Sequence, residues 1–274
     1  MEAFDTNNLV DGFKRLLNKI EYKQRIERDI NDFLKNKKEL DKDPDSMVAL
    51  KKLGELIASR NYYRRKYAEL FKEEFERVEH LGSGFFRTEK GKEILVEIIR
   101  KVAFRQDIAE KKTRDLLKEL GQKSIRDWTE HIHTLSQSGE GSEILGPKGR
   151  DIYLRDMGYL DRVPMDIHEM RFIIKTGIYH LCSRSLFDPL KKDDLQSAMV
   201  NFCREYLLGL SIHGIDLSKN PGIVDLIIWY HCADPPDGFS ICAIKPKCLE
   251  KEDICPLSRA CLFFTMKTKR SAPK

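Results

Sequence analysis

Apolar side chains recur every three or four residues along most of the sequence, and this spacing constrains the fold more than any other feature. Such spacing places the apolar residues on one face of a helix. The first stretch that shows it contains Leu9, Val10, Phe13, Leu16, Leu17 and Ile20. Residues 94–102, 195–210 and 222–232 also read as helices, and no strand pattern persists. The sequence therefore predicts an all-α fold, and its 34% of charged residues favours long, solvated helices.

Proline, glycine and polar residues mark the predicted breaks between helices. The charged stretch Lys35 to Asp45 carries Pro44 and is predicted to contain a turn. A second break is predicted at Gly82 to Gly84, and a polar loop at Ser136 to Ser142. No apolar run is long enough for a membrane-spanning helix, so we expect no membrane partner.

The seven cysteines are unevenly placed. None precedes Cys182, and five fall between Cys232 and Cys261. The start of the sequence lacks the basic-then-apolar layout of a signal peptide, so we expect an intracellular protein whose thiols stay reduced. A cluster of reduced cysteines typically holds a metal or a metal cluster. The net charge of +5 permits an acidic partner without requiring one.

A glycine-containing turn, Leu145 to Gly149, lies between the polar loop and a predicted helix. Glycines at a helix start let backbone N–H groups point outward, which suits the binding of phosphate. Lys148 lies inside this turn, and Asp166 follows 18 residues later at the start of another predicted helix, where an N-cap belongs. Taken singly, the lysine is typical of a solvated surface charge and the aspartate of an ordinary cap.

Taken together, these residues resemble the helix-hairpin-helix DNA glycosylase superfamily, in particular its endonuclease III-like and 8-oxoguanine glycosylase members. Gly146-Pro147-Lys148 is similar to the end of the family's hairpin signature, G-(V/I)-G-x-K. Val163-Pro164-Met165-Asp166-Ile167-His168 is similar to the family's second motif, V-P/A-V-D-(T/V)-H. The sequence departs from the pattern at Ile144, where the family has its first hairpin glycine.

The resemblance implies a bifunctional enzyme that releases a damaged base from double-stranded DNA and then cuts the strand. Lys148 would attack the sugar C1′ as the base leaves, and the resulting Schiff base would allow elimination of the 3′ phosphate. Asp166 would assist the nucleophile and stabilise positive charge on the sugar, with His168 supporting its turn. The target base must leave the stack to be reached. The residues expected to contact DNA are Gln106, which would fill the gap left by the base, Gly146, Gly149 and Arg150.

Four late cysteines form a second motif that resembles this family: Cys242, Cys248, Cys255 and Cys261. Endonuclease III and the MutY-type adenine glycosylases bind a 4Fe–4S cluster through C-x6-C-x2-C-x5-C. The last spacing agrees here, the first is one residue shorter, and the middle one has six intervening residues instead of two. Cys232 is an alternative first ligand, zinc an alternative metal, and buried unliganded thiols a further alternative. Cys182 and Cys203 lie in apolar helices and are expected in the core.

The resemblance implies a two-lobed helix-hairpin-helix glycosylase fold with a C-terminal cysteine-cluster loop. Its expected segments are residues 1–85, which pack with the C-terminal lobe, residues 86–190, which carry the hairpin, and residues 191–274, which hold the last helices and the cluster loop. The expected protein is a monomeric, cytoplasmic, nucleoid-associated DNA glycosylase and AP lyase acting on an oxidised base, with pyrimidines first and 8-oxoguanine second. The alternatives are a non-catalytic DNA-binding module and a zinc-stabilised helical interaction protein.

Overall fold

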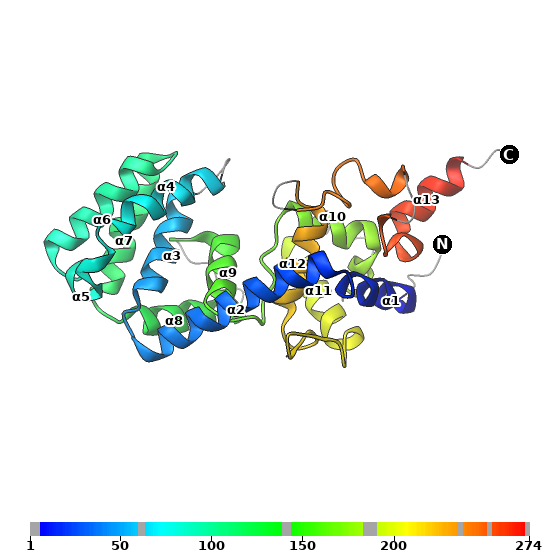
Figure 1. Cartoon of the computed structure of the whole chain (residues 1–274), viewed down its shortest axis with the longest axis horizontal. Helices are drawn as coiled ribbons and strands as arrows, with labels where there is room; N and C mark the ends of the chain where they lie inside the picture. Colours follow the sequence, from blue (N-terminus) through cyan, green and yellow to red (C-terminus); the bar gives the residue numbers. More distant parts are fainter. Residues whose placement is uncertain are drawn as a thin grey trace. The chain divides into compact units, whose positions relative to one another are not determined.

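The structure is a computed structural model that describes residues 6–59, 64–138, 144–182, 191–234, 238–250 and 254–271. Nearly all of the described elements are helices, which confirms the all-α prediction (Figure 1). The only strands among the described residues are β1 (Ser211–Ile212) and β2 (Ile215–Asp216), which pair antiparallel. Within the described part of the chain, no helix combines the length and the apolar character that a membrane crossing requires.

The chain divides into two compact units, and each is described by itself. Unit 1 combines Met1–Asn31 with Leu160–Lys274, and unit 2 is Asp32–Tyr159. These divisions do not coincide with the boundaries expected from the sequence at residues 85 and 190. Residues 32–85 belong to the hairpin-bearing unit because two of their helices, Met47–Ala58 and Arg64–Glu76, pack against the helix Glu89–Val102.

Unit 2 is a bundle of short helices around one apolar core. Its largest fully buried side chains include Trp128, Tyr153, Phe71 and Phe75. Its elements, besides the second half of α2 (Ile20–Lys42), are α3 (Met47–Ala58), α4 (Arg64–Glu76), η1 (Glu79–Leu81), α5 (Ser83–Phe86), α6 (Glu89–Val102), α7 (Gln106–Leu120), α8 (Ile125–Gln137) and α9 (Gly146–Asp156).

Helix α2 extends further than the sequence predicted. The stretch expected to turn, Lys35 to Asp45, is helical as far as Lys42. Phe33 and Leu40 are both buried there, so the apolar stripe of the helix continues through the charged residues. The turn is confined to the residues around Pro44, where the Asp43 side chain accepts a hydrogen bond from the Asp45 backbone N–H at 3.0 Å.

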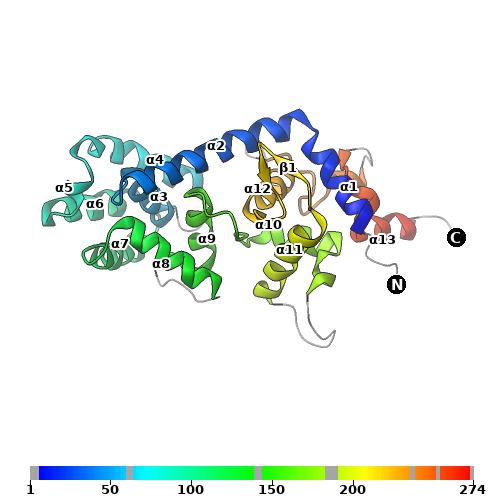
Figure 2. The same cartoon turned by 90° about the horizontal axis from the view of Figure 1, so that it is seen from below.

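Unit 1 is organised around α12 (Pro221–Cys232), which is buried on nearly every side and packs against α10 and α11 (Figure 2). Its apolar composition on all faces explains this central place. The other elements of the unit are α1 (Thr6–Leu17), the first half of α2, α10 (Ile167–Thr176), η2 (Ile178–Leu181), α11 (Lys192–Tyr206), η3 (Lys247–Leu249), η5 (Ser258–Ala260) and α13 (Leu262–Ser271).

Candidate functional site

The glycine-containing turn of the sequence forms the first turn of α9. This helix begins at Gly146, so half-buried Lys148 is its third residue. Gly146 has a φ of +68°, in the left-handed region that glycine adopts without strain. Most of the polar loop predicted before it, residues 139–142, lies outside the described residues.

The apolar residues before α9 and a lysine on α7 hold this turn in place. Ile144 and Leu145 are buried in the core of unit 2. The Lys112 ammonium donates a hydrogen bond to the Ile144 carbonyl. Ile144, which departs from the family's hairpin glycine, therefore acts here as an apolar anchor. A Cβ on Gly149 would meet only the Leu145 Cβ, at an ordinary 3.5 Å, so packing does not require a glycine at that position.

Arg150 is turned into the protein and does not present its guanidinium to solvent, which corrects the predicted DNA contact. It is 3% exposed, and its Nε donates to Asp151 Oδ1 at 2.9 Å. The Ser136 hydroxyl donates to the same oxygen at 3.0 Å. A buried arginine needs such a partner, and the Ser136 hydrogen bond ties α9 to α8. The prediction failed because adjacency to a basic hairpin does not show on which side of the helix a residue lies.

Gln106, predicted to fill the gap left by a flipped base, is the exposed first residue of α7. Sequence reasoning missed the nearby Phe104, whose side chain is 56% exposed in the loop before α7. The sequence signal that could have identified it is a bulky aromatic residue in the short segment between the apolar stripes of α6 and α7. Its ring contacts Tyr67 of α4, with the ring centroids 5.8 Å apart.

Asp166 is the N-cap of α10, as its place in the sequence predicted. Its Oδ1 accepts a hydrogen bond from the His168 backbone N–H at 2.6 Å. In return, Glu169 Oε2 accepts one from the Asp166 backbone N–H at 3.0 Å, which completes a capping box. Asp166 is half-buried and belongs to unit 1, whereas Lys148 belongs to unit 2.

Glu169 is a second residue that sequence reasoning missed, although an acidic residue three positions after a cap is the usual sign of a capping box. It is only 1% exposed. Burial, and then the charge of Asp225 on α12, raises the pKa of Glu169 well above its ordinary value. The cap of Asp166 therefore includes a buried carboxyl group whose surroundings favour its neutral form.

The four cysteines singled out by spacing line one cavity in unit 1. Cys242, Cys248, Cys255 and Cys261 are all buried, and the cavity that they line has a volume of about 10 Å³. Its other lining residues are Phe172, Lys175, Thr176, His231, Pro246, Leu257 and Phe263. Cys232 is buried too, but it does not line the cavity. Its thiol lies beside Cys242 and, as a hydrogen-bond donor, lowers the pKa of Cys242.

The cysteine loops are fastened to the helices around them. The Cys261 thiol donates to the Lys175 carbonyl at 3.2 Å, and the Cys255 Sγ lies 3.4 Å from His231 Nε2. Arg15 of α1 donates to the Pro256 carbonyl at 2.7 Å. Part of the longer middle interval, residues 251–253, lies outside the described residues.

Four buried thiols are a donor set whose chemistry suits either an iron–sulfur cluster or zinc. Among the described residues, no three His, Cys, Asp or Glu side chains converge closely enough to hold one metal ion. A single zinc ion needs its thiolates to converge at about 2.3 Å. Four soft sulfur donors line one small cavity here, with the Cys255 and Cys248 thiols in hydrogen-bond contact.

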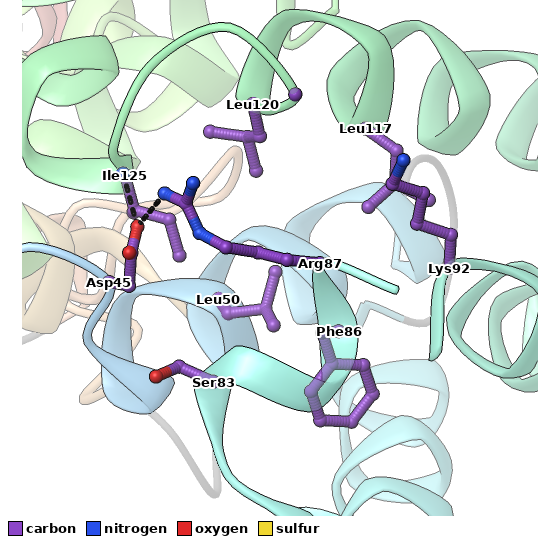
Figure 3. A pocket seen from close by; sticks show the side chains of 10 residues that line it. Asp45, Leu50, Ser83, Phe86, Arg87, Lys92, Leu117, Leu120 and Ile125 are labelled. Atoms are coloured by element: carbon purple, nitrogen blue, oxygen red, sulfur yellow. Dashed lines mark hydrogen bonds and ion pairs between the residues drawn. The ribbon is translucent and has the colours of Figure 1, made fainter. Parts of the chain in front are cut away.

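A second cavity, of about 110 Å³, lies in unit 2 (Figure 3). Arg87 and Asp45 form an ion pair in it, and Asp45 Oδ1 also accepts from the Ile125 backbone N–H at 3.2 Å. Lys92 reaches the cavity and pairs with Glu89 at 2.6 Å. Ile125 begins α8, whereas the hairpin follows the other end of that helix, so the cavity belongs to a different part of unit 2 from Lys148.

Comparison with known proteins identifies the fold. No family model matches the sequence, and no curated protein matches it. The structure is similar to that of the 8-oxoguanine DNA glycosylase of Thermotoga maritima, with a TM-score of 0.50 and 18% sequence identity. The match covers 82% of this chain and 96% of that one. The chain therefore has the same all-helical fold as that enzyme.

Proposed function

We propose that the protein is a DNA glycosylase with AP-lyase activity, acting on a damaged base in double-stranded DNA. The observation that carries the proposal is Lys148 in the first turn of α9, two residues after a glycine in the left-handed conformation, within the fold of a DNA glycosylase. In that fold family, a lysine at this position separates enzymes that also cut the strand from those that only release the base.

In the proposed reaction, the neutral Lys148 amine forms a bond to C1′ while the bond from C1′ to the base breaks. The base leaves with the bonding electrons and takes up a proton. The amine loses its protons as the sugar ring opens to a Schiff base, and loss of a C2′ proton then expels the 3′ phosphate. The Asp166 carboxylate stabilises the positive charge that develops on the sugar. Its backbone cap at 2.6 Å from His168 fixes the orientation of that carboxylate.

The proposed DNA contacts come from backbone groups and from the start of α7. Backbone N–H groups at the start of α9, where Gly146 is the first residue and Gly149 lies in the same turn, suit a phosphate oxygen. Gln106 and Phe104 are both exposed, lie on either side of Arg105 in the chain, and supply a polar and an apolar side chain. Side chains of this kind enter the stack when a base is flipped out. Arg150 has no part in this proposal because it is buried.

The proposed substrate is an oxidised base. Oxidised pyrimidine is the first candidate, because a lysine combined with a four-cysteine motif resembles endonuclease III. 8-Oxoguanine is the second candidate, and it is the base named for the structural neighbour. Both lesions belong in the same assay.

The proposed cofactor is a 4Fe–4S cluster held by the four cysteines that line the cavity, with zinc as the alternative. Supporting this are the burial of all four thiols and the shared space between them. Cys242, Cys248, Cys255 and Cys261 lie on separate turns of the C-terminal segment, and a bound cluster would tie these turns to one another.

The test is covalent trapping on duplexes that each carry one lesion. We expect borohydride to trap the wild-type protein on at least one oxidised lesion, and Lys148→Ala to abolish that product. Lys118→Ala is the matched control, because Lys118 is an exposed lysine near the far end of α7. Failure of the wild-type protein to be trapped or to release any base would overturn the proposal. Binding to DNA without release would favour a non-catalytic DNA-binding module.

A further inference from the structure

Two buried side chains, one that lines the cysteine cavity and one that contacts it, take no part in the reaction proposed above. Tyr22 of α2 is 2% exposed and His231 of α12 is 1% exposed. The Tyr22 hydroxyl lies 2.9 Å from His231 Nδ1. The other ring nitrogen, Nε2, lies 3.4 Å from the Cys255 Sγ. The imidazole thus bridges a tyrosine hydroxyl and a proposed ligand sulfur.

The donor and acceptor roles in these two hydrogen bonds are fixed once Cys255 is a thiolate. A metal-bound thiolate carries no proton, so a hydrogen bond to it must come from His231 Nε2–H. In a neutral imidazole, Nδ1 is then the acceptor, and the Tyr22 hydroxyl donates to it. In a charged imidazole, Nε2–H would still face the sulfur. The geometry therefore gives Cys255 a hydrogen-bond donor in either protonation state of His231.

His231 also holds a second proposed ligand through its backbone. Its carbonyl accepts hydrogen bonds from the Ile241 N–H at 2.9 Å and from the Cys242 N–H at 3.1 Å. One residue therefore contacts Cys242 through the main chain and Cys255 through the side chain. These two cysteines are 13 residues apart in the sequence.

The tyrosine is held in place independently of the cysteines. Its ring stacks on Phe239 with centroids 4.3 Å apart and an interplanar angle of 30°. The Arg25 guanidinium lies over the Phe239 ring, 4.7 Å from its centroid. Aromatic and cation–π contacts of this kind fix the ring without using its hydroxyl, which is then free to orient the imidazole.

We propose that Tyr22 and His231 form a hydrogen-bond relay that positions Cys255 as a ligand and sets both the retention and the reduction potential of the iron–sulfur cluster. The inference rests on the proposed cofactor. A donor to a ligand sulfur stabilises the more negative, reduced state, so loss of the donor shifts the potential to more negative values. Loss of a partner that orients a ligand typically weakens metal binding about 10- to 100-fold.

The test compares Tyr22→Phe and His231→Leu with the wild-type protein, all purified without oxygen. The readouts are the iron and sulfide content, the rate of iron transfer to a chelator, and the reduction potential from voltammetry. We expect iron release to be about 10-fold faster or more in both variants, with a more negative potential. Tyr230→Phe is the matched control, because it removes a hydroxyl from the neighbouring residue that bonds to Asp29 instead.

Unchanged iron release and an unchanged potential in Tyr22→Phe would overturn the relay, even if His231→Leu failed to fold. A wild-type protein that contains no iron would overturn it as well. Borohydride trapping on the same preparations separates this failure from that of the proposed function. Trapping by a protein that contains no iron would overturn the relay and support the glycosylase. Iron in the wild-type protein, with faster iron release in the variants but no trapping, would support the relay and overturn the glycosylase.

Discussion

Glu169 supports Asp166 from within the protein: its Oε2 accepts the Asp166 backbone N–H at 3.0 Å, while its Oε1 is buried without a hydrogen-bond partner among the described residues. An ionised carboxylate in that position would leave a buried charge uncompensated. Burial and the nearby Asp225 accordingly raise its pKa. The residue proposed to stabilise the sugar cation is thus held by a carboxyl group that favours its neutral form.

Glu169→Gln should make stability less dependent on pH. A raised pKa in the folded state means that the wild-type protein loses stability as the pH rises from the unfolded-state pKa of Glu169 toward the folded-state pKa. The loss is about 1.4 kcal/mol per pH unit within that window. Glutamine keeps the acceptor for the Asp166 N–H and removes this loss. In urea unfolding between pH 4 and 8, the free energy of unfolding of the variant should increase relative to that of the wild-type protein as the pH rises.

The exposed Glu205→Gln is the control for that series, because its side chain lies on the surface of α11 in the same unit. A constant difference between Glu169→Gln and the wild-type protein across the pH range would show that Glu169 ionises normally.

Asp166→Asn should separate the cap from the chemistry. Asparagine caps helices about as well as aspartate, so the free energy of unfolding should change by less than about 0.5 kcal/mol. The carboxylate charge is lost, and we expect base release to fall by about 100-fold or more. Asp166→Ala should show the same kinetic loss together with about 1 kcal/mol of destabilisation. Single-turnover base release and urea unfolding measure the two effects; near-normal release by Asp166→Asn would remove the proposed role.

Substitution of single cysteines should identify the ligand set. Cys248→Ser is expected to lower the iron content, because Cys248 lines the cavity. Cys232→Ser is expected to retain iron, since Cys232 is buried beside Cys242 but outside the lining. Iron and acid-labile sulfide per chain give the readout. The reverse pattern would assign Cys232 as a ligand in place of one of the four.

Arg150→Ala should affect folding rather than DNA binding. Removal of one partner of a buried ion pair leaves Asp151 uncompensated and typically costs about 3–5 kcal/mol. Under conditions where the variant is folded, the salt dependence of its affinity for duplex DNA should match that of the wild-type protein. A shallower dependence with unchanged stability would show that Arg150 contacts a phosphate after all.

The features that the sequence predicted are those with local causes. Helical spacing located α12, and an aspartate before an apolar helix located the Asp166 cap. What it could not predict depends on tertiary packing. Arg150 follows a basic hairpin in the sequence, but the three-dimensional position of Asp151 and Ser136 turns it inward. Glu169 is neutral in character because it is buried near Asp225, which lies on another helix.

The discontinuous composition of unit 1 has a consequence for biosynthesis. A ribosome completes all of unit 2 before it reaches residue 160, so unit 2 can fold while α1 still lacks its partners. The Arg15 guanidinium, for example, bonds to the Pro256 carbonyl, which is synthesised 241 residues later. The contacts between the two segments of unit 1 can therefore form only after unit 2 has been synthesised, and the buried face of α1 lacks its native partners until then.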